Sequence, residues 1–161
     1  GMEMSAEIHL NIGETAAATD GAVIKAYALG SCVAVCLYDP STKTGAMAHV
    51  LLPDSGGQGE GLAAERRGRY ADTAVAELLR LMKLKGADLG KTWAKIYGGA
   101  KMFGFGPQMI NCDIGKLNSE AAAAQLAKHG VPLTEAQVGG GYARTVSFDT
   151  ADGSVSVSCR E

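Results

Sequence analysis

Residues 29–52 read LGSCVAVCLYDPSTKTGAMAHVLL, and this stretch decides the fold prediction. Large and small side chains alternate through residue 37, which is typical of a strand that resumes after an interruption at Gly30-Ser31. The turn formers of residues 39–45 then reverse the chain into a second strand, predicted over residues 46–52. That second strand is apolar on both faces, so we expect it to lie inside a layered domain.

Working outward, the pattern predicts further strands and two helices. A helix is indicated by apolar residues spaced three and four apart, and it should end at Gly86. A second helix is predicted from an Asn118 cap to His129. The other expected elements are an extended region over residues 22–38, strands over residues 93–97, 133–138, 143–149 and 154–159, and a long loop over residues 53–69. Strands outnumber helices and often follow one another, which favours an α+β fold in one domain of residues 2–161.

Composition excludes several classes of protein. The chain has 161 residues, of which 47% are hydrophobic and 20% charged, with a net charge of -2. This balance is typical of a globular protein and gives no electrostatic reason to expect nucleic acid. Neither a signal peptide nor an apolar run of about 20 residues is present, so we predict a cytoplasmic protein without membrane insertion.

The motifs give no reason to expect a metal or another cofactor. The four cysteines show no CxxC pair, which indicates free thiols and leaves no zinc-ligand spacing. Residues 86–92 resemble a phosphate-binding loop, but only three residues separate the glycines where four are needed. We therefore predict that the protein uses no cofactor.

Cys32 is the first candidate for chemistry. The two small residues before it, Gly30 and Ser31, leave backbone amides free to approach a substrate and to stabilise an oxyanion. A thiol of ordinary pKa also needs a base. Of the three histidines, His9 and His129 have adequate structural explanations, whereas His49 lies in the middle of an apolar strand.

Pattern alone leaves two alternatives open for this pair. Cys32 can be a buried thiol and His49 a core histidine, or the two can form a catalytic dyad. A symmetric closure that pairs Asp39 with Gly45 would put the two side chains on opposite faces of the hairpin. They share a face only if the register is offset by one residue or contains a bulge. The sequence does not decide this register.

Several segments together resemble one family, the CheD chemoreceptor glutamine deamidases. The resemblance rests on residues 29–40 and 45–55, and it continues through residues 69–74, 94–103, 114–118 and 139–144. It implies a three-layer α/β/β architecture with mixed and antiparallel sheets, related to the catalytic domain of the cytotoxic necrotizing factors. It also implies hydrolysis of receptor glutamines to glutamates through a cysteine thioester with release of ammonia, and an activity that extends to glutamate methyl esters.

The resemblance assigns roles to individual residues. Cys32 corresponds to the nucleophile and His49 to the general acid/base, with the amides around Gly30 and Ser31 holding the oxyanion. The third catalytic position of the family is a threonine six residues before the cysteine, and here that residue is Ala26. A backbone carbonyl can orient a histidine as well as a hydroxyl can, so we expect Ala26 to contribute only its C=O.

The implied partners are the cytoplasmic helices of chemoreceptors, as substrates, and a CheC-type phosphatase. Residues 53–69 are a candidate rim for the receptor site. The alternative interpretation is a catalytically impaired regulatory binder of a CheC-type phosphatase or of receptors, and the replacement at Ala26 motivates it. Retention of both Cys32 and His49 argues against that alternative, because a binder has no chemical need for either side chain.

Overall fold

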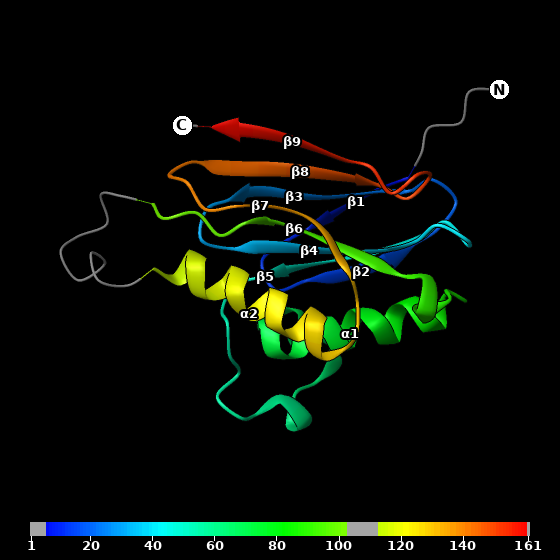
Figure 1. The fold of residues 1–161 in the computed structure, drawn as a ribbon, viewed down its shortest axis with the longest axis horizontal. Helices are drawn as coiled ribbons and strands as arrows, with labels where there is room; N and C mark the ends of the chain where they lie inside the picture. Colours follow the sequence, from blue (N-terminus) through cyan, green and yellow to red (C-terminus); the bar gives the residue numbers. More distant parts are fainter. Residues whose placement is uncertain (1–5, 103–112, 161) are drawn as a thin grey trace.

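The computed structural model describes residues 6–102 and 113–160. Figure 1 shows three layers in them: an outer sheet, a central sheet and a pair of helices. The outer sheet has the strand order β1-β3-β8-β9 and the central sheet the order β2-β5-β4-β6-β7. The strands are β1 (Glu7–Leu10), β2 (Thr15–Ala18), β3 (Val23–Leu29), β4 (Val33–Asp39), β5 (Thr44–Val50), β6 (Trp93–Gly98), β7 (Leu133–Val138), β8 (Ala143–Asp149) and β9 (Val155–Arg160). Both sheets mix parallel and antiparallel pairs, which confirms the α/β/β prediction.

Strands β4 and β5 are buried along their whole length because the central sheet is covered on both faces. Side chains alternate between the two faces of a strand. Val33, Val35 and Leu37 therefore pack in the core beneath the helices, whereas Cys36 and Tyr38 pack in the core between the two sheets. The three layers thus enclose two apolar cores, and the face of β4 on which a residue lies decides to which core it belongs.

The two helices, α1 (Ala71–Leu84) and α2 (Ile114–Lys128), cover the face of the central sheet opposite the outer sheet (Figure 1). Helix α1 ends at the predicted place, where Gly86 adopts a φ of 90° that favours glycine. The predicted cap of α2 is wrong. The helix begins at Ile114, and its cap is Asp113, whose side chain accepts a hydrogen bond from the Lys116 N–H at 3.0 Å. Asn118 lies inside the helix and is fully buried.

The prediction missed β2, because its sequence of one threonine and three alanines has no alternating pattern. It also placed the strand that carries His49 two residues late, since β5 spans Thr44–Val50. The long segment after β5 is not a structureless loop. It contains two short 3-10 helices, Gly59–Gly61 and Ala64–Arg69, and the Arg69 carbonyl accepts hydrogen bonds from the N–H groups of Leu51 and Leu52.

Among residues 6–102 and 113–160, no helix is long and apolar enough to cross a membrane.

Candidate functional site

The register of the β4–β5 hairpin brings the two predicted catalytic residues to one face. Asp39 pairs with Thr44, one residue away from the symmetric closure, and Ala34 consequently pairs with His49. Directly paired residues of antiparallel strands share a face, and so do residues two apart on one strand. Cys32 and His49 therefore lie on the same side of the central sheet, the side that faces the outer sheet.

A cluster of hydrogen bonds in the hairpin turn fixes this register. The Asp39 carboxylate accepts hydrogen bonds from the Ser41 N–H at 2.8 Å, the Ser41 hydroxyl at 2.6 Å, the Thr42 hydroxyl at 2.8 Å and the Asp88 N–H at 2.7 Å. Burial alone would raise the pKa of Asp39, but these hydrogen bonds lower it to about 2. The turn is therefore held by a carboxylate that stays ionised.

The environment of the pair is apolar. Cys32 is 7% exposed and His49 is 3% exposed. Burial raises the pKa of the Cys32 thiol. Burial also lowers the pKa of the His49 imidazole, against smaller opposing effects of the Leu10 carbonyl and the Glu14 carboxylate. Both groups thus favour their neutral forms, which makes His49 available as a base and leaves Cys32 as a thiol that needs one.

The carbonyl that faces the imidazole belongs to Leu10 at the end of β1, with its oxygen 3.4 Å from His49 Nδ1. The backbone around His49 is held by the next loop, since its C=O accepts from the Gly13 N–H at 2.7 Å and its N–H donates to the Glu14 C=O at 3.0 Å. Ala26 is fully buried and pairs with Leu10 in the parallel β1–β3 ladder. Between Ala26 and His49, the described residues show no hydrogen bond.

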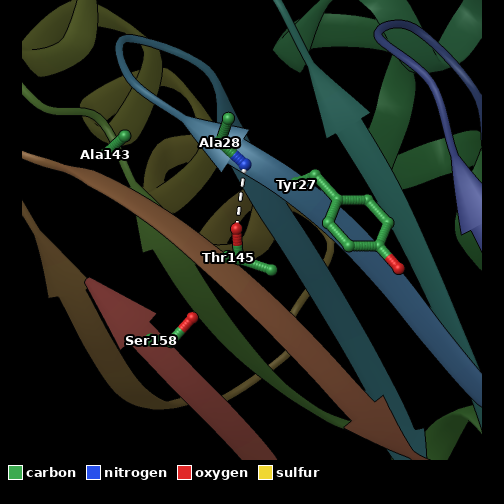
Figure 2. A pocket seen from close by; sticks show the side chains of 5 residues that line it. All are labelled: Tyr27, Ala28, Ala143, Thr145 and Ser158. Atoms are coloured by element: carbon green, nitrogen blue, oxygen red, sulfur yellow. Dashed lines mark hydrogen bonds between the residues drawn. The ribbon is translucent and has the colours of Figure 1, made fainter. Parts of the chain in front are cut away.

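A β-bulge leads the chain into the Cys32 turn. The pairing of β3 with β8 shifts between Ala26 and Leu29, and Ala28 adopts a φ of 53°, a strained value for a residue with a side chain. Figure 2 shows how this residue is held, with the Ala28 N–H donating to the Thr145 hydroxyl of β8 at 3.1 Å. A shallow hollow of about 330 Å³ lies there on the outer sheet, lined by Tyr27, Ala28, Ala143, Thr145 and Ser158.

The three consecutive carbonyls of Gly30, Ser31 and Cys32 are all tied down. The Gly30 carbonyl accepts from the Ala100 N–H at 2.8 Å, and the Cys32 carbonyl accepts from the Gly99 N–H at 2.9 Å. The Ser31 carbonyl accepts from the Asn118 side chain at 2.9 Å. Within the described part of the chain, the N–H groups of these three residues have no hydrogen-bond partner. The amides that the sequence assigned to an oxyanion are therefore available for one.

Among the described residues, the remaining thiols and histidines differ from this pair in burial or in position. Cys36 is fully buried, and burial raises its pKa. Cys159 is exposed, and Cys112 lies outside the described residues. His9 is on β1, where its ring stacks on Tyr27, and His129 ends α2. Cys36 shares the core between the two sheets with Cys32, but its side chain has no exposed surface.

Two residues of the site were not predicted. Leu10 contributes a backbone carbonyl, and an apolar side chain gives no sign of such a role. The sequence predicts Asn118 as a helix cap, although an amide side chain on the interior face of a helix is itself a signal of a buried hydrogen-bonding role.

The comparisons with known proteins agree on one family. The family model described as CheD chemotactic sensory transduction matches residues 51–159. A protein of Thermotoga maritima named chemoreceptor glutamine deamidase CheD is 43% identical over 148 residues, which cover 92% of this chain and 88% of the relative. A protein of Archaeoglobus fulgidus named probable chemoreceptor glutamine deamidase CheD is 40% identical over 150 residues, which cover 93% and 91% of the two chains. The chain therefore belongs to the CheD family.

Proposed function

We propose that this protein is a chemoreceptor glutamine deamidase that acts through Cys32 and His49. The observation that carries the proposal is the hairpin register. Among the described residues, His49 is the only histidine in the layer between the sheets, and it lies on the same face as Cys32, whose turn has unpaired amides. The names of the relatives give the substrate class.

In the first half of the reaction, His49 takes the thiol proton as Cys32 Sγ attacks the side-chain carbonyl carbon of a glutamine. The negative oxygen that forms accepts hydrogen bonds from the free N–H groups of the Gly30–Cys32 turn, each contributing about 3 kcal/mol. His49 then gives the proton to the nitrogen, the C–N bond breaks, and ammonia leaves. A thioester between Cys32 and the receptor side chain remains.

In the second half, His49 removes a proton from a water molecule as its oxygen attacks the thioester carbon. The same amides hold the second oxyanion. The C–S bond breaks, the proton returns to Cys32, and the side chain leaves as a glutamate. A glutamate methyl ester has the same acyl group with methanol as the leaving group, so we infer that the site also hydrolyses such esters.

The surface near the site suits a helical substrate. Two apolar residues next in sequence to segments of the site are exposed. Ile12, at 55%, precedes Gly13, whose N–H donates to the His49 carbonyl, and Leu117, at 48%, precedes Asn118. Exposed apolar side chains favour docking of a partner helix. Residues 53–69, which follow the His49 strand, form one rim in this proposal. The cytoplasmic helices of receptors as substrates imply a cytoplasmic enzyme.

We also propose a CheC-type phosphatase as a second partner, on the family resemblance given above. It would present a helix to the same surface and would therefore compete with receptors. Competition is measurable, because added CheC should lower the deamidation rate without changing the rate at saturating receptor.

The central test is the intact mass of a receptor cytoplasmic fragment after incubation with the enzyme. Each event replaces NH2 by OH and gives a defined mass gain. Cys32→Ala and His49→Ala should each abolish this gain almost as completely as the double change, because a nucleophile and its base act as a unit. Cys159→Ala is the matched control and should keep wild-type activity. Full activity in Cys32→Ala would refute the proposed nucleophile.

A further inference from the structure

We propose that Asn118 is a positioning residue that aims the N–H of Cys32 at the oxyanion formed during catalysis. This inference rests on the proposed function, since it assigns a role within the same reaction. It concerns a helix residue that neither attacks the substrate nor moves a proton.

Asn118 connects the two halves of the site from the far side of the central sheet. Its side-chain nitrogen donates to the carbonyl of Ser31, directly before the nucleophile, at 2.9 Å. The same nitrogen donates to the carbonyl of Leu51, two residues after His49, also at 2.9 Å. Asn118 is fully buried, so no water competes for these two bonds.

Because the peptide bond is planar, the hydrogen bond from Asn118 to the Ser31 carbonyl also fixes the direction of the Cys32 N–H. The carbonyl of Ser31 and the N–H of Cys32 belong to one planar trans peptide, in which C=O and N–H point in opposite directions. Asn118 holds the C=O toward α2. The N–H of Cys32 is thereby held in the opposite direction, away from the helix layer and toward the side of the sheet where Cys32 and His49 lie.

The choice of residue supports this role over simple packing. The Asn118 Oδ1 atom is buried and has no hydrogen-bond partner among the described residues. An unsatisfied buried carbonyl costs about 1–3 kcal/mol, so an apolar residue of similar shape would be more favourable if packing were the only requirement. Two carbonyls need two donors, and a short amide supplies both from one nitrogen. An ionised aspartate has no donor and could make neither bond. The two hydrogen bonds to Ser31 and Leu51 therefore explain why the unsatisfied Oδ1 of Asn118 is tolerated.

The test compares two reactions of the Cys32 thiol: attack on the carbonyl carbon of a glutamine, and attack on the alkyl carbon of iodoacetamide. Iodoacetamide alkylates a thiol by displacement and forms no oxyanion, whereas deamidation needs one. Asn118→Leu and Asn118→Asp should lower kcat for a receptor fragment about 100-fold, the scale of losing one oxyanion donor, with KM within about threefold. The rate at which iodoacetamide alkylates Cys32 in these variants, measured by mass spectrometry of the proteolytic peptide that contains Cys32, should stay within about threefold of the wild-type rate.

Thr150→Val is the matched control, because Thr150 is also fully buried and its hydroxyl donates to a backbone carbonyl, that of Ala22, at 2.7 Å. This variant should lose comparable stability and keep both rates. Equal falls in deamidation and alkylation in the Asn118 variants would overturn the proposal, because they indicate general damage to the thiol. Unchanged kcat would overturn it as well. Full activity in Cys32→Ala would instead remove the proposed function itself.

A second measurement needs no variant. Butanal adds to a thiol to give a hemithioacetal: the S–C bond forms, and the thiol proton goes to the former carbonyl oxygen or to His49. In the adduct that oxygen takes the oxyanion position. The amide proton of Cys32 should then move downfield in the NMR spectrum of the wild-type protein. An amide resonance of Cys32 that does not move on adduct formation would overturn the proposal even if every Asn118 variant fails to fold.

Discussion

Gly98 at the end of β6 offers a sharp test of how the nucleophile is placed. Its φ is 115°, and a Cβ added there would lie 2.3 Å from the carbonyl oxygen of Cys32. Real Cβ atoms essentially never come closer than 3.0 Å to another heavy atom, so Gly98→Ala must displace the Cys32 carbonyl or β6 by at least about 0.7 Å. That carbonyl is the one held by the Gly99 N–H, and the displacement therefore reaches the nucleophile directly.

Two costs follow from this displacement. An alanine at positive φ costs about 1–2 kcal/mol, and the overlap adds about 1–3 kcal/mol. Misplacing a reacting group by about 1 Å can lower the rate about 100-fold. We therefore expect Gly98→Ala to lose stability and to deamidate at about one hundredth of the wild-type rate.

Gly130→Ala is the matched control. Gly130 also has positive φ, at 70°, but an added Cβ would find open space within 4 Å, so this variant pays only the backbone cost. Urea unfolding and the deamidation rate of a receptor fragment are measured for both variants. If Gly98→Ala matches Gly130→Ala in stability and stays within threefold of wild type in rate, the close contact with Cys32 does not position the nucleophile.

Three further predictions follow from the site. Asp39→Asn should lower the free energy of unfolding by about 2 kcal/mol at pH 7, because the pKa of Asp39 is about 2 in the fold against about 3.9 in the unfolded chain. Since the folded pKa is the lower one, the difference should shrink as pH falls from about 4 to 2 in urea titrations. The midpoint of the rise in deamidation rate with pH should lie below about pH 6.5, because burial lowers the pKa of His49 and only neutral imidazole is a base. A rate that still rises steeply from pH 7 to 8 would contradict that role. Ala26→Thr should change turnover by no more than about tenfold, because the Leu10 carbonyl already faces His49. If the wild type is nearly inert and Ala26→Thr is more active by orders of magnitude, the regulatory binder is favoured instead.

An α+β fold with a buried sheet could be predicted from side-chain patterns, whereas the three-layer α/β/β architecture was predicted from the family resemblance. Alternation identified β4, and the three- and four-residue spacing identified α1. Strand β2 could not be predicted, because three alanines fit a helix or a strand equally well without the neighbouring β5. The N-terminus of α2 was misplaced because asparagine is a good cap in isolation, and only the packed helix shows that Asn118 bonds to other segments.

The site itself was predictable only in its side chains. Cys32 and His49 are visible in the sequence, and their small or apolar neighbours are visible too. The Leu10 carbonyl and the carbonyl contacts of Gly99 and Ala100 belong to the backbone, which every residue type carries, so no residue letter marks them.

The hairpin register brings these two side chains to one face, and Asp39, in the turn between them, helps to decide that register. A slip of one residue would turn His49 toward the helices while Cys32 stayed between the sheets, because the side-chain period of a strand is two. The slip would also break the Asp39–Thr44 pair, where one carboxylate holds Ser41, Thr42 and the Asp88 N–H. Each charge-assisted hydrogen bond contributes roughly 1.5–3 kcal/mol. Because β5 is buried on both faces, its burial does not select one register, and the turn supplies that preference. The chemistry of the Cys32–His49 pair thus depends on an ionised aspartate at the opposite end of the hairpin.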